Sequence, residues 1–444
     1  MTNNYPGSAS MKRVLLVCPS VHHQGTQRIT PFWLPPLALA TVGGLFGSDW
    51  DVQLVDENVQ DIPEIGVWDL VFVTAYTANS ARAYALAKTF RQRGMTVVLG
   101  GAHVSVVPDE AAPHADAVVI GDAEHSLAVL LADWESGRLK ARYQAGTKAP
   151  MACFAVPRRD LFAAGAYLST NSIQASRGCP HVCSFCSIAS RYDRRYGKKA
   201  MEQLIGEIAG FADRGMPVFF VDDNIFVDRQ RSKEFLRALI PFKLTWWSQA
   251  DITIMHDEEL LALAKESGCL KLVVGFETVS QGGLAGINKH QNDIDVYYKF
   301  VETVHRHGVL VNTSFCFGND SDGPDIFEKT LEFLRLAGVM FATFNILTPL
   351  PGTQLYREML AAGRIVDHDW AHYDMGHVVF EPSGISREDL KAGYNKICGE
   401  FYGSKEIFRR IGQLEKSQST LDTKLILNWN LGYKRMLDNF GVFM

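Results

Sequence analysis

Short apolar runs alternate with amphipathic stretches of helical spacing along most of this 444-residue chain. Apolar runs of about four to eight residues, bounded by glycine, proline or polar residues, are typical of buried strands. Strands that alternate with helices pair in parallel, because each helix carries the chain back across the sheet. The alternation therefore predicts an α/β protein, and at about 150 residues per domain the length allows about three domains.

The first block of alternation ends near Trp134 and predicts a doubly wound, Rossmann-like domain over residues 1–140. Strands are predicted at residues 14–17, 52–55, 70–74, 96–100 and 117–120, and helices at residues 37–46 and 81–94. Ligands bind such sheets at the carboxyl ends of the strands, where small residues let a bulky ligand approach the backbone. The candidate ligand-binding residues of this domain are Tyr76, Thr77, Gly100, Gly101, His103 and Gly121.

A second block of alternation follows residues 141–166, which lose the pattern and are predicted to form a linker. Strands are predicted at residues 169–175, 218–221, 244–248, 272–274, 310–315 and 343–347. Such a series predicts a partial (β/α)6 barrel over residues 167–374, with its active site at the C-terminal ends of the strands. Residues 375–444 are predicted to form a small helical C-terminal region.

The composition is that of a soluble globular protein, with 47% hydrophobic and 21% charged residues. Lysine and arginine total 44 against 49 for aspartate and glutamate, so the net charge is −5 and nucleic acid is not an expected partner. No apolar stretch is long enough to span a membrane, and the N-terminus lacks the pattern of a signal peptide. The expected location is the cytoplasm.

Three of the eight cysteines crowd into one loop directly after the first strand of the second block. Cys179, Cys183 and Cys186 have the spacing Cys-x-x-x-Cys-x-x-Cys, and three such thiolates can hold three irons of a [4Fe–4S] cluster and leave the fourth iron open. Zinc is the alternative, but it needs a fourth ligand, and His181 lies inside the loop, where its side chain would have to double back. The spacing therefore predicts a [4Fe–4S] cluster.

The other five cysteines are widely spread and are interpreted as buried thiols: Cys18, Cys153, Cys269, Cys316 and Cys398. Cys316 follows a predicted strand and is the one candidate among them for a position close to the substrate.

Polar residues follow several predicted barrel strands. Asp222 and Asp223 end the second strand, where two carboxylates suit a ligand ammonium or hydroxyl but can equally cap the next helix. Gln249 and Glu277 close the third and fourth strands, and the sixth strand contributes Asn345. These side chains are the candidate ligand-binding residues of the barrel.

The second domain resembles the core of radical S-adenosylmethionine (SAM) enzymes over most of residues 169–351, on the strength of the cysteine loop. The resemblance implies that the open iron is chelated by the amino and carboxylate groups of SAM, and that one electron from the cluster produces the 5′-deoxyadenosyl radical. It also implies that Phe185 packs near the adenine, that the strand end at Asp222 contacts the methionyl ammonium, and that Glu277 binds the ribose. Plain loop packing is the alternative for Phe185.

The first domain resembles the cobalamin-binding domain of cobalamin-dependent radical SAM enzymes. This resemblance rests on the Gly100–His103 and Gly121–Glu124 turns, on Pro35-Pro36-Leu37 and on Tyr76-Thr77. The Asp-x-His-x-x-Gly signature of a histidine ligand to cobalt is absent, so a bound corrin is expected to be base-off. A purely structural domain is the alternative, whereas a nicotinamide site is disfavoured because no Gly-x-Gly-x-x-Gly opens the first helix.

The resemblances imply a cobalamin-dependent radical SAM methyltransferase that acts on an unactivated carbon of a small metabolite or a lipid. The tail around residues 370–373 and 401–404 resembles that of hopanoid methylases, and an electron donor such as flavodoxin or ferredoxin is the expected partner. Two alternatives stay open: a radical rearrangement, cyclisation or aminocarboxypropyl transfer, and a non-catalytic iron–sulfur or cobalamin sensor. Product analysis separates the first from methylation, and the absence of 5′-deoxyadenosine identifies the second.

Overall fold

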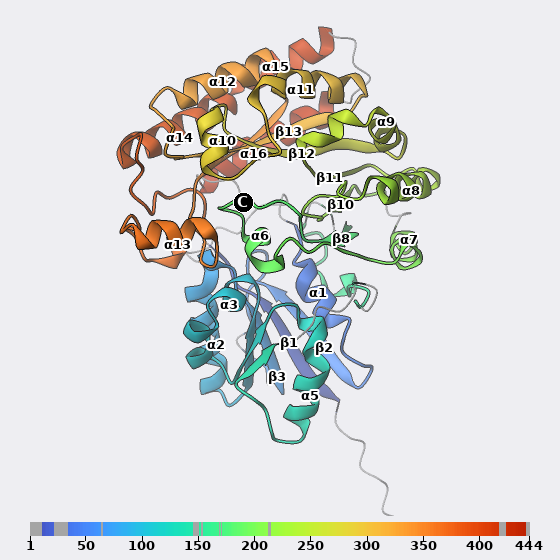
Figure 1. The fold of residues 1–444 in the computed structure, drawn as a ribbon. Coiled ribbons are helices and arrows are strands. Elements are labelled where there is room, and N and C mark those ends of the chain that lie inside the picture. The colour runs from blue at the N-terminus through green and yellow to red at the C-terminus, as the bar shows by residue number, and fades with distance from the viewer. Residues whose placement is uncertain are drawn as a thin grey trace, which may run out of the picture. The chain divides into compact units, whose positions relative to one another are not determined.

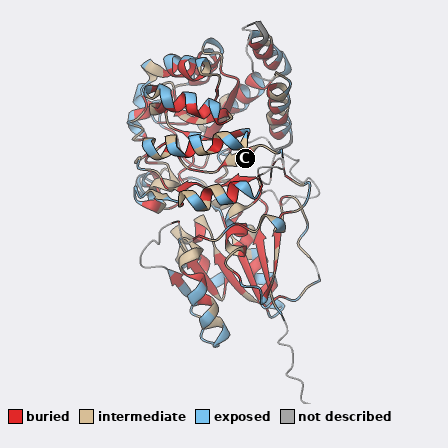
Figure 2. Ribbon diagram, turned by 90° about the vertical axis from the view of Figure 1, so that its right-hand side faces the viewer, coloured by how far each residue is buried: buried red, intermediate tan, exposed pale blue. Residues whose placement is uncertain are grey.

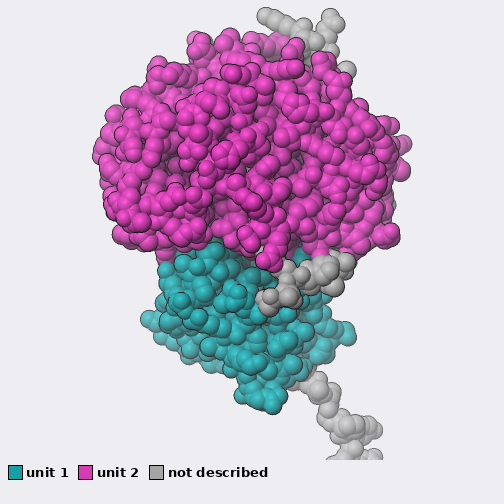
Figure 3. Space-filling view, viewed as in Figure 1, with its two compact units in different colours: residues 1–149, 153–167 teal, residues 150–152, 168–444 magenta. Residues whose placement is uncertain are grey.

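The computed structural model describes residues 11–21, 34–63, 65–144, 151, 154–167, 169, 171–211, 215–416 and 423–440. The chain forms two compact units, one of residues 1–149 and 153–167 and the other of residues 150–152 and 168–444 (Figure 3). Among the described residues, no helix is both long and apolar enough to cross a membrane.

The first unit is built on a parallel sheet of six strands in the order β2-β1-β3-β4-β5-β6 (Figure 1). Its strands are β1 (Lys12–Cys18), β2 (Trp50–Asp56), β3 (Leu70–Thr74), β4 (Thr96–Gly100), β5 (Ala117–Ile120) and β6 (Arg142–Gln144). Its α-helices are α1 (Leu37–Gly43), α2 (Ser80–Gln92), α3 (Ala102–Val106), α4 (Pro108–Ala111) and α5 (Leu127–Glu135). The strand order reverses between β1 and β3, and this reversal makes a crevice at their carboxyl ends.

Both faces of this sheet are buried, which is why its strands are continuous apolar runs. Leu16 and Phe72 pack on one face, in a core with Leu39 of α1 and Leu130 of α5. The neighbouring residues Leu15 and Val71 point to the opposite face, toward Phe90 of α2. The predicted doubly wound domain is therefore confirmed.

The predicted linker contains parts of the first unit. β6 pairs with β5, and Phe162 lies in the core of the unit, as does Tyr167, which was predicted to begin the barrel. Tyr167 also donates a hydrogen bond to the fully buried Asp56, at 3.2 Å. The sequence does not predict β6, because this edge strand has only three residues and two of them are exposed and charged or polar. It therefore contains no apolar run. Residues 145–150, 152 and 153 of the interval lie outside the described residues.

The second unit contains a parallel sheet of six strands in the order β14-β13-β12-β11-β10-β7. The strands are β7 (Ser172–Ile173), β10 (Val218–Phe220), β11 (Trp246–Ala250), β12 (Cys269–Glu277), β13 (Leu310–Phe317) and β14 (Phe341–Ile346). The helices between them are α6 (Ser187–Tyr192), α7 (Met201–Ala209), α8 (Arg229–Leu239), α9 (Glu258–Glu266), α10 (Gln281–Gly286), α11 (Tyr297–Arg306) and α12 (Ile326–Leu336). The order of consecutive strands, with β7 and β14 at the two edges, is that of the predicted partial barrel.

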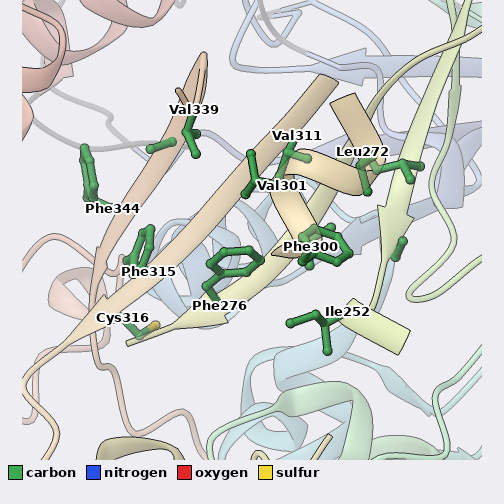
Figure 4. Close-up of a cluster of buried hydrophobic side chains, with 14 of the residues drawn as sticks. Ile252, Leu272, Phe276, Phe300, Val301, Val311, Phe315, Cys316, Val339 and Phe344 are labelled. Carbon is green, nitrogen blue, oxygen red and sulfur yellow. The ribbon is translucent and has the colours of Figure 1, made fainter. Parts of the chain in front are cut away.

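The main core of this unit lies between the barrel strands and the surrounding helices. Phe276 of β12 stacks on Tyr297 with ring centroids 4.1 Å apart and also contacts Phe300 of α11. Figure 4 shows Phe276 and Phe300 with Val311 and Phe315 of β13 in this cluster. Each helix turns its apolar stripe to the strands and its polar face outward, as the banded burial in Figure 2 shows.

The C-terminal helices lie in the same compact unit as the barrel and pack on it. They follow α13 (Gln354–Ala361) and are α14 (Arg387–Phe401), α15 (Ser404–Lys416) and α16 (Thr423–Phe440). The Tyr402 hydroxyl donates to the Ala342 carbonyl at 2.7 Å and accepts from the Ala342 amide at 3.2 Å. It thereby satisfies backbone groups that an edge strand leaves free. Tyr402 and Phe401 therefore attach the tail to β14.

Lys271 of β12 is buried in an aromatic cage that joins the barrel to α16. Its ammonium lies 4.1 Å from the ring centroid of Trp429 and 5.1 Å from that of Phe341. Tyr433 and Trp247 complete the cage at 5.7 and 5.8 Å. Aromatic faces attract a cation, but burial is the larger effect and lowers the pKa of Lys271 to about 7.

Lys271 is expected to make the unfolding free energy depend on pH. The unfolded chain keeps this proton up to about pH 10.5, whereas the folded protein loses it from about pH 7, so stability should rise between these two values. Because the cage offsets part of the cost of burial, we expect a rise on the order of 2 kcal/mol. Urea unfolding of the wild type and of Lys271→Met at both ends of this range measures the rise. Lys271→Met should remove it, and an equal rise in both proteins would contradict the assignment.

Candidate active site

A cavity of about 340 Å³ lies at the carboxyl ends of the barrel strands. The cysteine loop contributes Cys179, Cys183, Phe185 and Cys186 to its wall. The strand ends contribute Asp223, Gln249, Glu277 and Asn345, and Cys316 also lines it. The structure thus brings together these sequence-predicted barrel residues, with the exception of Asp222.

The two adjacent aspartates have different roles, which the sequence left open. Asp222 is fully buried; it accepts a hydrogen bond from the Ala175 amide at 3.0 Å and another from the Ser176 hydroxyl. Asp223 reaches the cavity and accepts from the Gly178 amide at 2.8 Å. Contrary to the expectation of a ligand contact, Asp222 therefore positions the segment before the cysteines. Asp223 both fixes the loop and faces the cavity.

The three thiols fit an iron–sulfur cluster. All are free, and burial raises the pKa of Cys179 to about 11 and raises the pKa of Cys186. In the described part of the chain, no three His, Cys, Asp or Glu side chains are gathered closely enough for a single metal ion. The thiolates of a cubane cluster lie farther apart than the ligands of a single ion, because each thiolate binds a different iron. When bound, the cluster supplies the electron that cleaves SAM.

His181 lines the same cavity as the cysteines, but its side chain is engaged by a carboxylate. Its Nε2 lies 2.9 Å from Asp251, which also accepts from Asn224 at 2.8 Å. Burial would raise the pKa of Asp251, but hydrogen bonds from His181 and Thr253 outweigh it and lower the pKa. Asp251 directly follows β11 in the structure, but the strand was predicted to end at residue 248, so Gln249 was selected and Asp251 was not.

Glu277 holds an unusual backbone conformation at the end of β12. Its φ is 66°, a left-handed value that costs a non-glycine residue about 1–3 kcal/mol, and the pairing of β12 with β13 shifts register just before it. Its carboxylate accepts from the Lys289 ammonium at 2.7 Å, and a Cβ on Gly275 would lie 2.2 Å from the same oxygen. The backbone therefore holds this carboxylate at the cavity wall, where it suits a ligand hydroxyl.

Two further cavity residues come from a segment that the sequence analysis did not select. Lys289 and Gln291 follow α10, in a stretch without strand or helix periodicity. Gln291 lies 3.7 Å from the Cys183 sulfur. No local sequence signal marks them, because the fold alone brings this segment to the cysteine loop.

The candidate site of the first unit lies at the β1/β3 crevice. Asn79 donates to the Pro19 carbonyl at 2.9 Å and accepts from the Tyr76 amide at 2.7 Å, so it joins the ends of the two strands. The side chain of Tyr76 is exposed. Gly101 has a φ of 102°, and a Cβ there would lie 2.6 Å from the Thr74 hydroxyl. Thr74 and Ala75 fill the space that a Cβ on Gly101 would take, so this glycine lets the turn after β4 pack closely against the end of β3.

His103 does not face that crevice, contrary to the expectation of a cofactor contact. Its side chain is fully buried, with Nδ1 3.3 Å from the Thr77 hydroxyl and Nε2 3.2 Å from Glu110. Burial lowers the pKa of His103, against the effect of Glu110. His103 therefore helps to hold the turn at Thr77 in place. Gly121 has a φ of 86°, with no atom of the described residues within 4 Å of a Cβ placed there.

Two family models match the chain: the B12 binding domain over residues 30–131 and the Radical SAM superfamily over residues 173–334. The bacteriochlorophyllide d C-8(2)-methyltransferase of Chlorobaculum tepidum is 31% identical over 392 residues, which are 84% of this chain and 87% of that protein. The chain belongs to the B12-binding radical SAM family. The predicted [4Fe–4S] cluster, SAM and cobalamin are the cofactors of this family member.

Two further relatives of this B12-binding radical SAM protein are methyltransferases as well. The bacteriochlorophyllide d C-12(1)-methyltransferase of C. tepidum is 29% identical over 85% of this chain and 84% of its own. The hopanoid C-2 methylase of Rhodopseudomonas palustris is 28% identical over 76% of this chain and 66% of its own. The methyltransferase activity predicted from the sequence is thereby confirmed.

Solved structures show the same fold. The radical SAM methyltransferase TsrM from Kitasatospora setae has a TM-score of 0.64 and 18% identity, over 79% of this chain and 75% of its own. The cobalamin-dependent radical enzyme OxsB has a TM-score of 0.69 and 14% identity, over 97% of this chain and 72% of its own. The predicted α/β architecture is thus confirmed for both domains.

Proposed function

We propose that this radical SAM methyltransferase methylates an unactivated carbon on a side chain of a tetrapyrrole. The observation that carries the proposal is the match of two bacteriochlorophyllide d methyltransferases along 84% and 85% of this chain.

The walls of the cavity suit a nucleotide on one side and a hydrocarbon on the other. Cys179, Cys183 and Cys186 would hold the cluster, with Glu277 on the ribose hydroxyls of SAM. Ile346, Leu347, Leu350 and Met375 form an apolar wall that would exclude water from the reacting carbon.

Residues outside the apolar wall would orient the two cofactors. Asp223 would receive the SAM ammonium, and Phe185, Gln249 and Asn345 would surround the nucleotide. In the first unit, the turns at Tyr76–Thr77, Gly100–Gly101 and Gly121 would support the corrin, which supplies the methyl group when bound. A low-potential donor of the flavodoxin or ferredoxin type would reduce the cluster.

The proposal predicts a defined product pattern for the holoenzyme. With trideuteromethyl-labelled SAM, a low-potential reductant and bacteriochlorophyllide d, the label should appear in the tetrapyrrole. S-adenosylhomocysteine and 5′-deoxyadenosine should form in equal amounts, because one SAM supplies the methyl group and the other the radical. Mass spectrometry of the pigment and the nucleosides measures all three.

Other outcomes identify the alternatives. If a hopanoid is labelled and the tetrapyrrole is not, the enzyme is a methyltransferase but the proposed substrate is wrong. 5′-Deoxyadenosine with an unlabelled, rearranged or cyclised product would contradict methyl transfer. The absence of both 5′-deoxyadenosine and S-adenosylhomocysteine under full reduction would identify a sensor.

A further inference from the structure

The segment after α10 is docked on the cysteine loop by several independent contacts. The Ser184 amide donates to the Ile287 carbonyl at 3.0 Å. Asn292 donates to the Gly275 carbonyl at 2.9 Å and so attaches the segment to the end of β12. Lys289 and Gln291 lie between these two anchors. Their position beside the cysteines is therefore imposed by the fold of the segment.

The two side chains present a positive charge and an N–H donor to the thiolates. Gln291 Nε2 donates to the Cys183 sulfur at 3.7 Å. The Lys289 ammonium is nearly buried, and its charge acts on both Cys183 and Cys186. Glu277 accepts from it at 2.7 Å and neutralises part of that charge. Lys289, Gln291 and Glu277 thus contribute a cation, a neutral donor and an anion to the electrostatic field at the cluster side of the cavity.

We propose that Lys289 and Gln291 raise the reduction potential of the [4Fe–4S] cluster. Reduction adds a negative charge to the cluster, so a nearby cation and a hydrogen bond to a ligating sulfur both favour the reduced form. Burial strengthens the effect, because little water screens the charge of Lys289. Both are positioning residues that act on SAM cleavage through the cluster, and the contact with Glu277 links the SAM site to the same field.

The inference rests on a cluster held by Cys179, Cys183 and Cys186, and not on the tetrapyrrole substrate. Its test therefore uses the full-length reconstituted protein without substrate or SAM. The measurement is a redox titration of the cluster followed by electron paramagnetic resonance, with iron and sulfide content determined for every variant. A failure of methyl transfer would leave this result unchanged.

Removing the charge or the donor should make the cluster harder to reduce. In Lys289→Met the ratio of reduced to oxidised cluster at a fixed potential should fall about tenfold, or ~59 mV for a one-electron couple. Gln291→Leu should lower the ratio by a smaller factor of about three to five. Lys289→Arg should keep the wild-type potential. Gln230→Leu, on the exposed face of α8 where Gln230 contacts Glu234 at 2.9 Å, is the matched glutamine control.

Glu277→Gln should shift the reduction potential of the cluster in the opposite direction. Without the Glu277 carboxylate, the charge of Lys289 is no longer offset, so the reduced fraction should rise above the wild type. A loosened loop would not produce opposite shifts in Lys289→Met and Glu277→Gln. Wild-type potentials in Lys289→Met and Gln291→Leu at full cluster content would overturn the proposal, as would shifts of one sign in Lys289→Met and Glu277→Gln.

Discussion

Replacement of Cys183 with alanine is expected to abolish reductive cleavage of SAM. Cys183 is buried in the wall of the cavity, and each of the three loop thiolates would hold a different iron. Loss of one thiolate leaves an iron without its protein ligand and the cluster open to solvent. We expect the rate of 5′-deoxyadenosine formation to fall by at least about a thousandfold, which is about 4 kcal/mol in the barrier.

The matched control is Cys398→Ala. Cys398 is a buried free thiol on α14 and does not line the cavity, so its replacement should leave the iron content and SAM cleavage close to wild type. Both variants are reconstituted anaerobically with iron and sulfide, and 5′-deoxyadenosine is measured after reduction. Wild-type cleavage by Cys183→Ala would contradict the cluster assignment. Equal loss in both variants would show general damage by cysteine removal.

Gly178→Ala is expected to have the second large effect, through the geometry of the cysteine loop. Gly178 has a φ of 91°, and a Cβ there would lie 2.0 Å from the Arg195 carbonyl oxygen. Backbone on both sides must move, and the hydrogen bond from the Gly178 amide to Asp223 would be lost with it. We expect a loss of about 3 kcal/mol or more in unfolding free energy and a large fall in bound iron.

Gly338→Ala is the control that separates the effect of steric overlap in Gly178→Ala from the effect of an unfavourable backbone conformation. Gly338 also has a left-handed φ, of 67°, but a Cβ there meets no atom of the described residues within 4 Å. Its replacement should cost only the conformational strain of about 1–2 kcal/mol and leave bound iron unchanged. Thermal unfolding followed by circular dichroism, together with iron content, measures both effects. Full iron content in Gly178→Ala would contradict the loop geometry.

Much of the fold follows from local patterns. The strands 70–74, 96–100 and 117–120 have the same bounds in the structure as in the sequence analysis. Each is an apolar run between charged or glycine-rich segments, and burial on both faces of a parallel sheet requires that continuity. Four of the five scattered cysteines are buried as predicted, whereas Cys153 lies outside the described residues.

The division of roles within the site could not be predicted in the same way. Asp222 and Asp223 are neighbours with the same chemistry, yet only Asp223 reaches the cavity. Successive residues at a strand end point to opposite sides, so the register of β10 in the sheet decides which one faces the ligand. His103 shows the same limit, because its burial depends on Glu110 and Thr77, which pack around it from other parts of the unit.

The order of strands and helices, the three-cysteine loop and the strand-end polar residues can be read from the chain, because they depend on spacing over a few residues. The electrostatic field around the cysteines does not depend on local spacing in the sequence. Gln291 contacts Cys183, and Lys289 contacts Glu277, only after β12, α10 and the cysteine loop have packed together. Contacts between residues about 100 positions apart leave no periodic signal, so this part of the site exists only in the folded protein.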